Sequence, residues 1–415
     1  MQRHRTEGRE ASAATACAKW YSITLLLIAE VAGMSLWFTT SAILPDLIAE
    51  TSLTPFRQAA LSSAVQAGFV IGALISAILG LPDRFDPRRI FALSAISAGL
   101  FNASLLTIDP ASDLAIATRV MTGALLAGVY PVGMKIVVGW GLNDRGFLVS
   151  ALVGALTLGS AIPHLLAYGG GTAWQLTVQF ASLAAIAGGV LCLAISLGPH
   201  HGTATRFDPG AITQAWTNRR VRLAYAGYLG HMWELYAMWA WIGVATAASY
   251  TATMAQGPAG DFAKLTAFTA IAVGALSSTL AGIVADKIGK AEVALVAMAI
   301  SGTCAVLTAL TFGGPAWLTF IIVVLWGLSI VPDSAQFSAL VADASPPEQA
   351  GSLMTFQTAL GFTLTFVTVQ LTPVAATNFG WPVVLAALAL GPAFGIVAMM
   401  RLRAMGTSVT PASVK

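Results

Sequence analysis

The stretch GIVADKIGK, residues 282–290, is a short charged turn between two long apolar runs. A related turn, GLPDRFDPRR at residues 80–89, lies in the first half of the chain, and its Asp83 lies 203 residues before Asp286. The two turns therefore occupy corresponding places in two halves of similar length. Self-similarity at a fixed offset predicts an internal repeat, and a repeat of this length decides the fold.

A second pair of segments repeats at nearly the same offset. From Glu30 the sequence reads EVAGMSLW, and from Glu234, 204 residues later, it reads ELYAMWAW. A glutamate, a small residue, a methionine and a tryptophan thus recur at one spacing. Gly146 and Gly351 lie 205 residues apart and agree with both pairs. Three such similar offsets indicate a duplication.

The composition indicates a membrane protein. Of the 415 residues, 57% are hydrophobic and only 9% are charged, whereas a soluble domain carries about 25% charged residues. So few charges cannot cover a water-facing surface of this size. The net charge of +3 gives no reason to expect a nucleic-acid partner. Cys17, Cys192 and Cys304 are isolated and far apart, which predicts neither a metal site nor a disulfide framework.

Apolar runs of about 20 residues, the length that crosses a bilayer, predict twelve transmembrane helices. The first run is longer than a signal-peptide core, so we interpret it as an uncleaved helix. The predicted helices are 20–44, 58–80, 88–108, 113–141, 146–168, 173–198, 222–250, 261–285, 292–313, 315–342, 350–373 and 381–401.

The longest internal polar stretch divides these helices six and six. This predicts five parts: an N-terminal tail at 1–19, an N-terminal bundle at 20–198, a central loop at 199–221, a C-terminal bundle at 222–403 and a tail at 404–415. Because six crossings return the chain to the starting side, the two halves run in the same direction.

The distribution of lysine and arginine predicts the orientation. With the N-terminus inside, seventeen of these residues fall on the inner side and two, Arg57 and Lys264, on the outer side, while Arg119 and Lys135 fall within a helix. An excess of positive charge marks the cytoplasmic side. We therefore expect a multi-pass protein of the cytoplasmic (inner) membrane with both termini in the cytoplasm.

The charged turns carry a resemblance to a known family. Twelve helices in two parallel halves, with a G-x-x-x-D-[RK]-x-G-[RK] turn after the second and eighth, resemble the major facilitator superfamily of secondary transporters. The later turn matches at every named position, whereas the earlier one has Gly80 three residues before its aspartate and Asp86 at the second glycine position. The resemblance implies an all-α membrane fold in which these turns form a charged latch at the cytoplasmic helix ends, with the residues Asp83, Arg84, Arg88, Arg89, Gly282, Asp286, Lys287, Gly289 and Lys290.

The predicted helix 113–141 carries a second likeness. Its segment RVMTGALLAG resembles the R-x-x-x-G-x-x-x-[AG] pattern of facilitators that couple to protons, with Arg119 and Gly123 in place. The next helix has Gly154, Gly159 and Pro163 but lacks the adjacent Gly-Pro of the family's antiporters. Symport and uniport therefore remain open.

Ionisable residues inside the predicted helices are the candidate site. A charge at mid-membrane costs roughly 2.5–3.5 kcal/mol on insertion scales, so each such residue is expected to be partnered, neutralised or in contact with water. The resemblance implies that the first, fourth, seventh and tenth helices line a central cavity. Most of the candidates fall on those helices; the full set is Glu30, Arg119, His164, His231, Glu234 and Asp333.

Helical spacing places some of these residues on common faces. His231, Glu234, Met238 and Trp241 share one face of the seventh helix, since residues three or four apart lie above one another. In the first helix, Glu30, Met34 and Trp37 do the same.

An acid beside a histidine can relay protons, because histidine titrates near neutrality. Two alternatives stay open: His231 and Glu234 satisfy each other and only fix packing, or Glu30 pairs with Arg119. Asp333, which follows Pro332, either lines the cavity or fixes a break in the tenth helix.

Together these patterns predict a proton-coupled secondary transporter that moves a small solute by alternating access. The alternatives are an uncoupled uniporter and a membrane receptor that binds without transport. An enzyme is not expected, since the motifs H-E-x-x-H, G-x-S-x-G and the phosphate-binding loop are missing from the sequence. We expect no cofactor, and we expect a monomer whose partners are the solute, the proton and the lipid bilayer.

Overall fold

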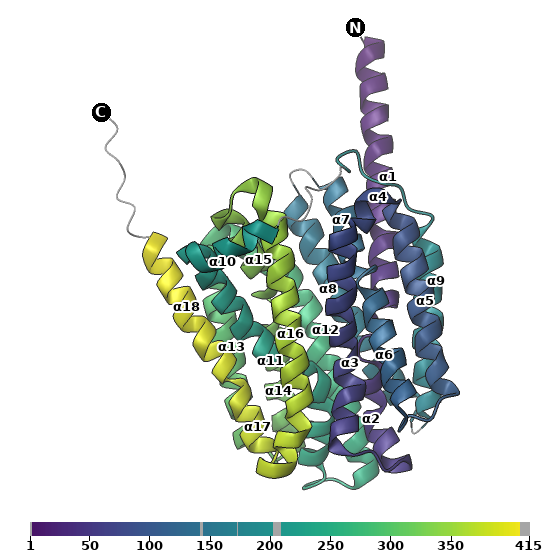
Figure 1. The fold of residues 1–415 in the computed structure, drawn as a ribbon, viewed down its shortest axis with the longest axis vertical. Coiled ribbons are helices and arrows are strands. Elements are labelled where there is room, and N and C mark those ends of the chain that lie inside the picture. The colour runs from purple at the N-terminus through teal and green to yellow at the C-terminus, as the bar shows by residue number, and fades with distance from the viewer. Residues whose placement is uncertain (1, 142–143, 172, 202–208, 407–415) are drawn as a thin grey trace.

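A computed structural model describes residues 2–141, 144–171, 173–201 and 209–406 of the chain. All regular elements in these ranges are helices, and most of them stand side by side along one direction (Figure 1). The start of α1 and the end of α18 lie at the same end of the bundle, as an even number of crossings requires (Figure 1).

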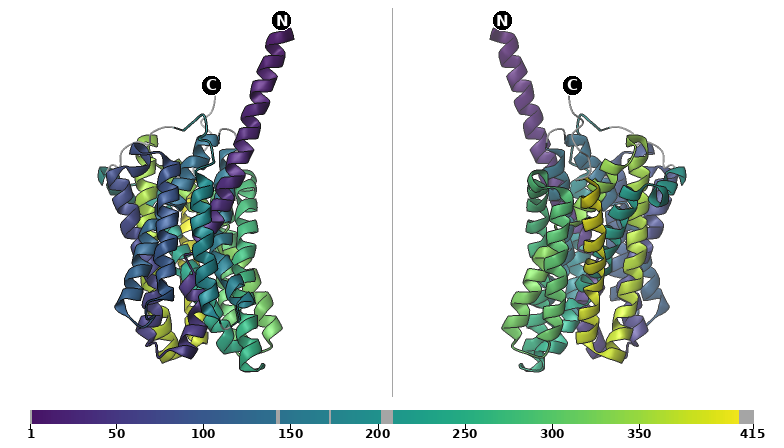
Figure 2. Two further views of the ribbon diagram at one scale, coloured as in Figure 1. Left: turned by 90° about the vertical axis from the view of Figure 1, so that its right-hand side faces the viewer. Right: turned by 90° about the vertical axis from the view of Figure 1, so that its left-hand side faces the viewer.

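The N-terminal half lies beside the C-terminal half (Figure 1). It consists of α1 (Gln2–Met34), α2 (Thr39–Glu50), α3 (Pro55–Leu79), α4 (Leu81–Arg84), α5 (Pro87–Ala103), η1 (Ser104–Leu106), α6 (Asp113–Leu126), α7 (Tyr130–Trp140), α8 (Arg145–Gly169) and α9 (Trp174–Cys192). The predicted tail 1–19 is largely the start of α1, which projects beyond the bundle (Figure 2).

The C-terminal half follows the predicted central loop, of which residues 202–208 lie outside the described residues. The loop contributes η2 (Pro209–Thr213) and α10 (Gln214–Thr217). The half itself consists of α11 (Arg219–Tyr250), α12 (Gln256–Ile288), α13 (Lys290–Leu310), α14 (Ala316–Ile330), α15 (Ser334–Ala344), α16 (Pro347–Phe379), α17 (Trp381–Leu388) and α18 (Leu390–Gly406).

The helices end at residues suited to that role. Thr54 and Asn218 precede α3 and α11, and their side-chain oxygens accept hydrogen bonds from backbone N–H groups of the first turn. Gly80 and Gly289 end α3 and α12 with φ angles of 61° and 103°. These conformations favour glycine, so each charged turn has a residue without a Cβ atom at the point where the helix ends.

Eleven segments of the described chain are long and apolar enough to cross a membrane. The one predicted helix without such a segment is the seventh, 222–250, which coincides with α11; α11 has 32 residues but falls outside that set. Arginines near its start, together with His231 and Glu234, lower its mean hydropathy. His231 and Glu234, which made this helix a candidate for the functional site, thus also lower the mean hydropathy by which a membrane-spanning helix is identified.

Three predicted helices are interrupted by three or more residues, and the predicted helix 381–401 has a one-residue turn at Ala389. The first breaks at residues 35–38, the fourth at 127–129 and the tenth at 331–333. Pro131 and Pro332 explain the last two, because proline cannot donate a helical hydrogen bond and its ring clashes with the preceding turn. The first break contains no proline, and the structure shows another cause, described below.

The two halves meet along two helix pairs, α8 with α12 and α3 with α16. Small residues allow α8 and α12 to approach closely, as is common in membranes. A Cβ atom added at Gly154 would lie 3.0 Å from the Ala275 carbonyl oxygen, and one at Gly282 would lie 2.6 Å from the Ser150 hydroxyl.

Candidate transport site

Arg119 is fully buried and holds the break in the first helix. Its Nη2 donates to the carbonyl oxygens of Leu36 (2.7 Å) and Trp37 (3.2 Å), and its Nη1 donates to Asn102 Oδ1 (2.6 Å). A cation at the carboxyl end of a helix satisfies carbonyl groups that have lost their helical partners. The possible pair between Arg119 and Glu30 is therefore wrong, because the guanidinium is engaged by the break instead.

Glu30 is buried at the contact between α1 and α7. Neither carboxylate oxygen has a hydrogen-bond partner among the described residues. A Cβ atom added at Gly133 would lie 2.8 Å from Oε2, so only glycine leaves room for the carboxyl group on that side. An ionised carboxylate in such surroundings is costly, whereas its protonated form carries no charge to bury.

Glu234 has the corresponding position in the C-terminal half but has partners. The Ser301 hydroxyl donates to Oε2 (2.9 Å), and the Trp326 indole N–H donates to Oε1 (2.7 Å). The residue 204 positions before Trp326 is Thr122, whose hydroxyl donates to the Thr118 carbonyl oxygen instead. The tryptophan that satisfies one glutamate therefore has no counterpart beside the other.

His231 lies against Asp333 of the tenth helix's break. Its Nδ1 is 2.9 Å from Asp333 Oδ1, an ion-pair distance, although the contact lacks hydrogen-bond geometry, and the two side chains are 1% and 2% exposed. His231 Nε2 has no partner in the described part of the chain. The alternative in which His231 and Glu234 satisfy each other is therefore wrong, and Asp333 sits where α14 gives way to α15.

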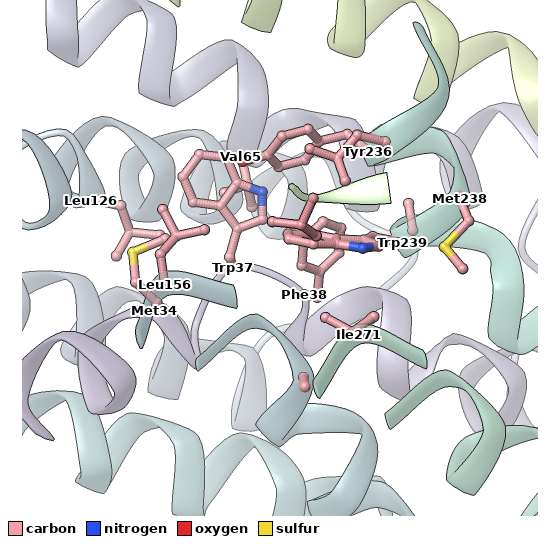
Figure 3. Packing of buried hydrophobic residues seen from close by; sticks show 14 of the residues in the cluster. Met34, Trp37, Phe38, Val65, Leu126, Leu156, Tyr236, Met238, Trp239 and Ile271 are labelled. Carbon is pink, nitrogen blue, oxygen red and sulfur yellow. The ribbon is translucent and has the colours of Figure 1, made fainter. Parts of the chain in front are cut away.

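The remaining predicted residues divide between the halves. Met34 and Met238 are buried on opposite sides of a group of aromatic rings (Figure 3). Trp241 donates its N–H to the Val369 carbonyl oxygen (3.0 Å) and is thereby held to α16. Trp37 lies in the break after α1, so the continuous face expected from Glu30 to Trp37 does not exist.

Six aromatic rings close the interface between the halves at this level. Trp37 lies 4.9 Å from Phe69, 5.7 Å from Tyr236 and 5.4 Å from Phe362, measured between ring centroids. Figure 3 shows Trp37 and Phe38 beside Tyr236 and Trp239 of the other half. We call these residues the aromatic cluster: Trp37, Phe38, Phe69, Tyr236, Trp239 and Phe362. Of these, only Trp37 belonged to the predicted site. The rings come from different helices, and the spacing of residues within one helix does not show which residues of another helix they contact.

Polar contacts join the halves at the end of the bundle opposite the termini. Lys264 of α12 lies 2.9 Å from Asp46 Oδ2 of α2 and donates to the Gly171 carbonyl oxygen (2.8 Å). The Ser63 hydroxyl of α3 donates to Gln370 Oε1 of α16 (2.7 Å). Lys264 and Asp46 are 6% and 12% exposed, so this ion pair is largely shielded from solvent.

The earlier charged turn is tied to its own half. Asp86 caps α5 and accepts from Arg88 Nη2 (2.7 Å), while Arg88 Nη1 donates to the Ile195 carbonyl oxygen (3.0 Å). These hydrogen bonds from Arg88 lower the pKa of Asp86. Arg84 and Arg89 are exposed, and the Asp83 side chain lies outside what the structure describes.

The later charged turn borders a pocket of about 670 Å³ between the ends of α11, α12, α13, α15 and α18. Asp286, Gly289 and Lys290 line it, and Lys290 pairs with Asp343 (2.5 Å). Lys287 is exposed, and Gly282 packs toward Ser150 of α8. No three His, Cys, Asp or Glu side chains of the described chain gather as a metal site would require.

The fold and its long apolar helices define a multi-pass membrane protein with two similar halves. A family model described as Major Facilitator Superfamily matches residues 25–362. The chain belongs to this superfamily, and it is a secondary transporter. No curated protein sequence matches it. Among solved structures it is similar to a D-xylose-proton symporter, with a TM-score of 0.70 and 14% identity over 92% of this chain and 97% of that one.

Proposed function

We propose that this transporter couples the movement of a small solute to protons by alternating access of its two halves. The observation that carries the proposal is the Glu30 carboxyl group, which is fully buried and accepts no hydrogen bond from the described residues. A carboxylate without partners is costly at membrane depth. Such a group takes up a proton while it is enclosed and releases it when water reaches it, which is the behaviour that proton coupling requires.

The C-terminal half supplies a second set of titratable groups. Glu234 is held by two neutral donors, and His231 lies beside Asp333 with its Nε2 available. None of these acids contacts a lysine or arginine in the printed geometry of the described chain. We propose that Glu234, His231 and Asp333 pass protons between the two sides as the C-terminal half moves.

The arrangement of the halves supports the rest of the proposal. The predicted bundles 20–198 and 222–403 rock about the aromatic cluster, and the turns at 80–89 and 282–290 act as latches at the opposite end from the Asp46–Lys264 pair. We place both termini in the cytoplasm and the protein in the inner membrane, because the inner side carries the excess of lysine and arginine. One copy contains both halves and suffices for this cycle.

D-Xylose is the first solute to test, because a structure of similar fold is named a D-xylose-proton symporter. The purified chain would be placed in liposomes, and uptake of each solute of a panel measured with and without an imposed pH gradient. We expect the gradient to drive accumulation of the true solute. Uptake that stops at equal concentrations on both sides, with or without the pH gradient, would identify an uncoupled uniporter and refute proton coupling.

The variants Glu30→Gln and Glu234→Gln separate coupling from binding. We expect each to abolish gradient-driven accumulation while solute exchange across the membrane, which needs no net proton movement, continues. Glu348→Gln is the matched control, since Glu348 is exposed at the start of α16. If Glu30→Gln still concentrates the solute, the assignment of Glu30 fails.

A further inference from the structure

The aromatic cluster contains two donors with no partner. The indole N–H groups of Trp37 and Trp239 are buried, and neither meets an acceptor among the described residues. The other buried indoles near the interface are satisfied: Trp241 donates to Val369, and Trp326 donates to Glu234. A buried donor left without an acceptor is destabilising, so the two exceptions call for an explanation.

The two donors lie where the halves meet. Trp37 comes from the break after α1 and Trp239 from α11, and both rings contact Tyr236, at 5.7 Å and 5.6 Å between centroids. Tyr236 thus bridges the two tryptophans, and the Phe38 ring lies 5.9 Å from both Tyr236 and Trp239 (Figure 3). A solute that enters between the halves would separate these rings and meet both N–H groups.

The buried charges of the site are directed elsewhere. The Arg119 guanidinium is held by Asn102 and the carbonyl groups of the break. Glu234 is held by Ser301 and Trp326 on α13 and α14, inside its own half. Glu30 packs against Gly133 of α7, and His231 lies beside Asp333. These charged groups thus make their contacts inside their own halves, whereas the rings and the two N–H donors of the aromatic cluster lie where the halves meet.

From this geometry we infer that the aromatic cluster is the solute site in its closed form, and that it takes an uncharged solute with a flat ring face and oxygen lone pairs able to accept at least two hydrogen bonds. The inference rests on the proposed transport function and specifies its substrate class. Aromatic side chains stack on such faces, and acceptors on the ring satisfy Trp37 and Trp239. A neutral aromatic amide and a cyclic polyol share this chemistry.

A thermal-shift assay on the full-length purified protein tests the charge preference of the site. The probes are benzamide and inositol, which are uncharged, with benzoate and benzylamine as charged counterparts of benzamide. We expect an uncharged probe to stabilise the protein more than either charged one, and whichever of benzamide and inositol binds identifies the kind of ring. Equal or stronger stabilisation by benzoate or benzylamine, or none by an uncharged probe, overturns the inference.

Variants locate the site. Trp37→Phe and Trp239→Phe keep a ring but remove the donor, and each is expected to weaken the binding of the uncharged probe by about 5- to 10-fold. Trp233→Phe is the matched control, because its N–H donates to the Ala387 carbonyl oxygen away from the cluster. Unchanged affinity in both cluster variants overturns the inference. If one variant fails to fold, the affinity of the other variant and the thermal shifts of the wild-type protein with the four probes still test the inference.

This binding assay uses no pH gradient, so its failure leaves proton coupling standing. Conversely, a loss of gradient-driven uptake in Glu30→Gln says nothing about the charge of the solute. The two proposals can therefore fail separately.

Discussion

The ion pair between Asp46 and Lys264 should hold the two halves together at the end opposite the termini. At a separation of 2.9 Å and an effective dielectric constant of about 20, Coulomb's law gives an attraction of about 6 kcal/mol before desolvation. Removing one partner of a buried pair costs about 3–5 kcal/mol. Lys264 keeps its bond to the Gly171 carbonyl oxygen, so we expect Asp46→Asn to lie at the lower end of that range.

A cost of about 3 kcal/mol corresponds to a shift of roughly 100-fold in the equilibrium between closed and open forms of this end. Spin labels at Ser52→Cys and Ala252→Cys, both exposed in the wild-type chain, would report the distance between the halves by pulsed electron resonance. The three native cysteines would first be replaced by alanine. Asp46→Asn is expected to raise the ratio of the longer to the shorter distance by roughly 100-fold.

The matched control is Arg57→Met. Arg57 pairs with Asp113 at the same end, but both residues belong to the N-terminal half and Asp113 is 90% exposed. This variant should leave the distance distribution unchanged, because exposed pairs contribute about 0–1 kcal/mol and this one joins no two halves. A distribution in Asp46→Asn that equals the control's would refute the reasoning.

Three further predictions concern stability, each measured by thermal unfolding of the purified protein. Gly133→Ala should lower the free energy of unfolding by about 1–3 kcal/mol, because its methyl group would collide with the buried carboxyl group of α1, whereas Gly146→Ala has open space and should be neutral. Arg119→Met should cost about 3–5 kcal/mol, since it strips a buried network of its charge; a loss below about 1 kcal/mol would contradict the role given to the break. Asp86→Asn should cost about 0.5–1 kcal/mol at neutral pH. Because the folded pKa of Asp86 is lowered by Arg88, this difference should be present above the usual aspartate pKa of about 4 and disappear as pH falls through the folded value; a difference that persists at low pH would contradict it.

The sequence was sufficient for the fold because the fold depends on long-range periodicity. Apolar runs and two charged turns about 200 residues apart predicted the helices and their order, and the structure agrees within a few residues for most of them. The broken helices were harder to foresee. The break in the tenth helix was one of the alternatives that the sequence left open at Pro332, and Pro131 marks the break in the fourth in hindsight. The break at 35–38 depends on a guanidinium from another helix.

The partners of the candidate residues could be predicted least. Arg119 donates to backbone carbonyl groups. Every residue has such a group, so the residue types in the sequence do not show which ones Arg119 contacts. His231 meets Asp333 across 102 positions of chain rather than its neighbour Glu234, because a helix face directs each side chain at a different partner helix. Helical spacing finds which residues share a face, but only packing decides what that face touches.

The break held by Arg119 makes the two halves mechanically unequal. The C-terminal counterpart of α1 and α2 is α11, one unbroken helix of 32 residues. The position 204 residues after Arg119 is Val323, which has no charge to hold carbonyl groups. The two halves of this duplicated molecule thus differ: the first helix of the N-terminal half is broken, and the corresponding helix of the C-terminal half is continuous. Bending during transport is expected to concentrate at the break between α1 and α2, whereas α11 is expected to move as one straight element.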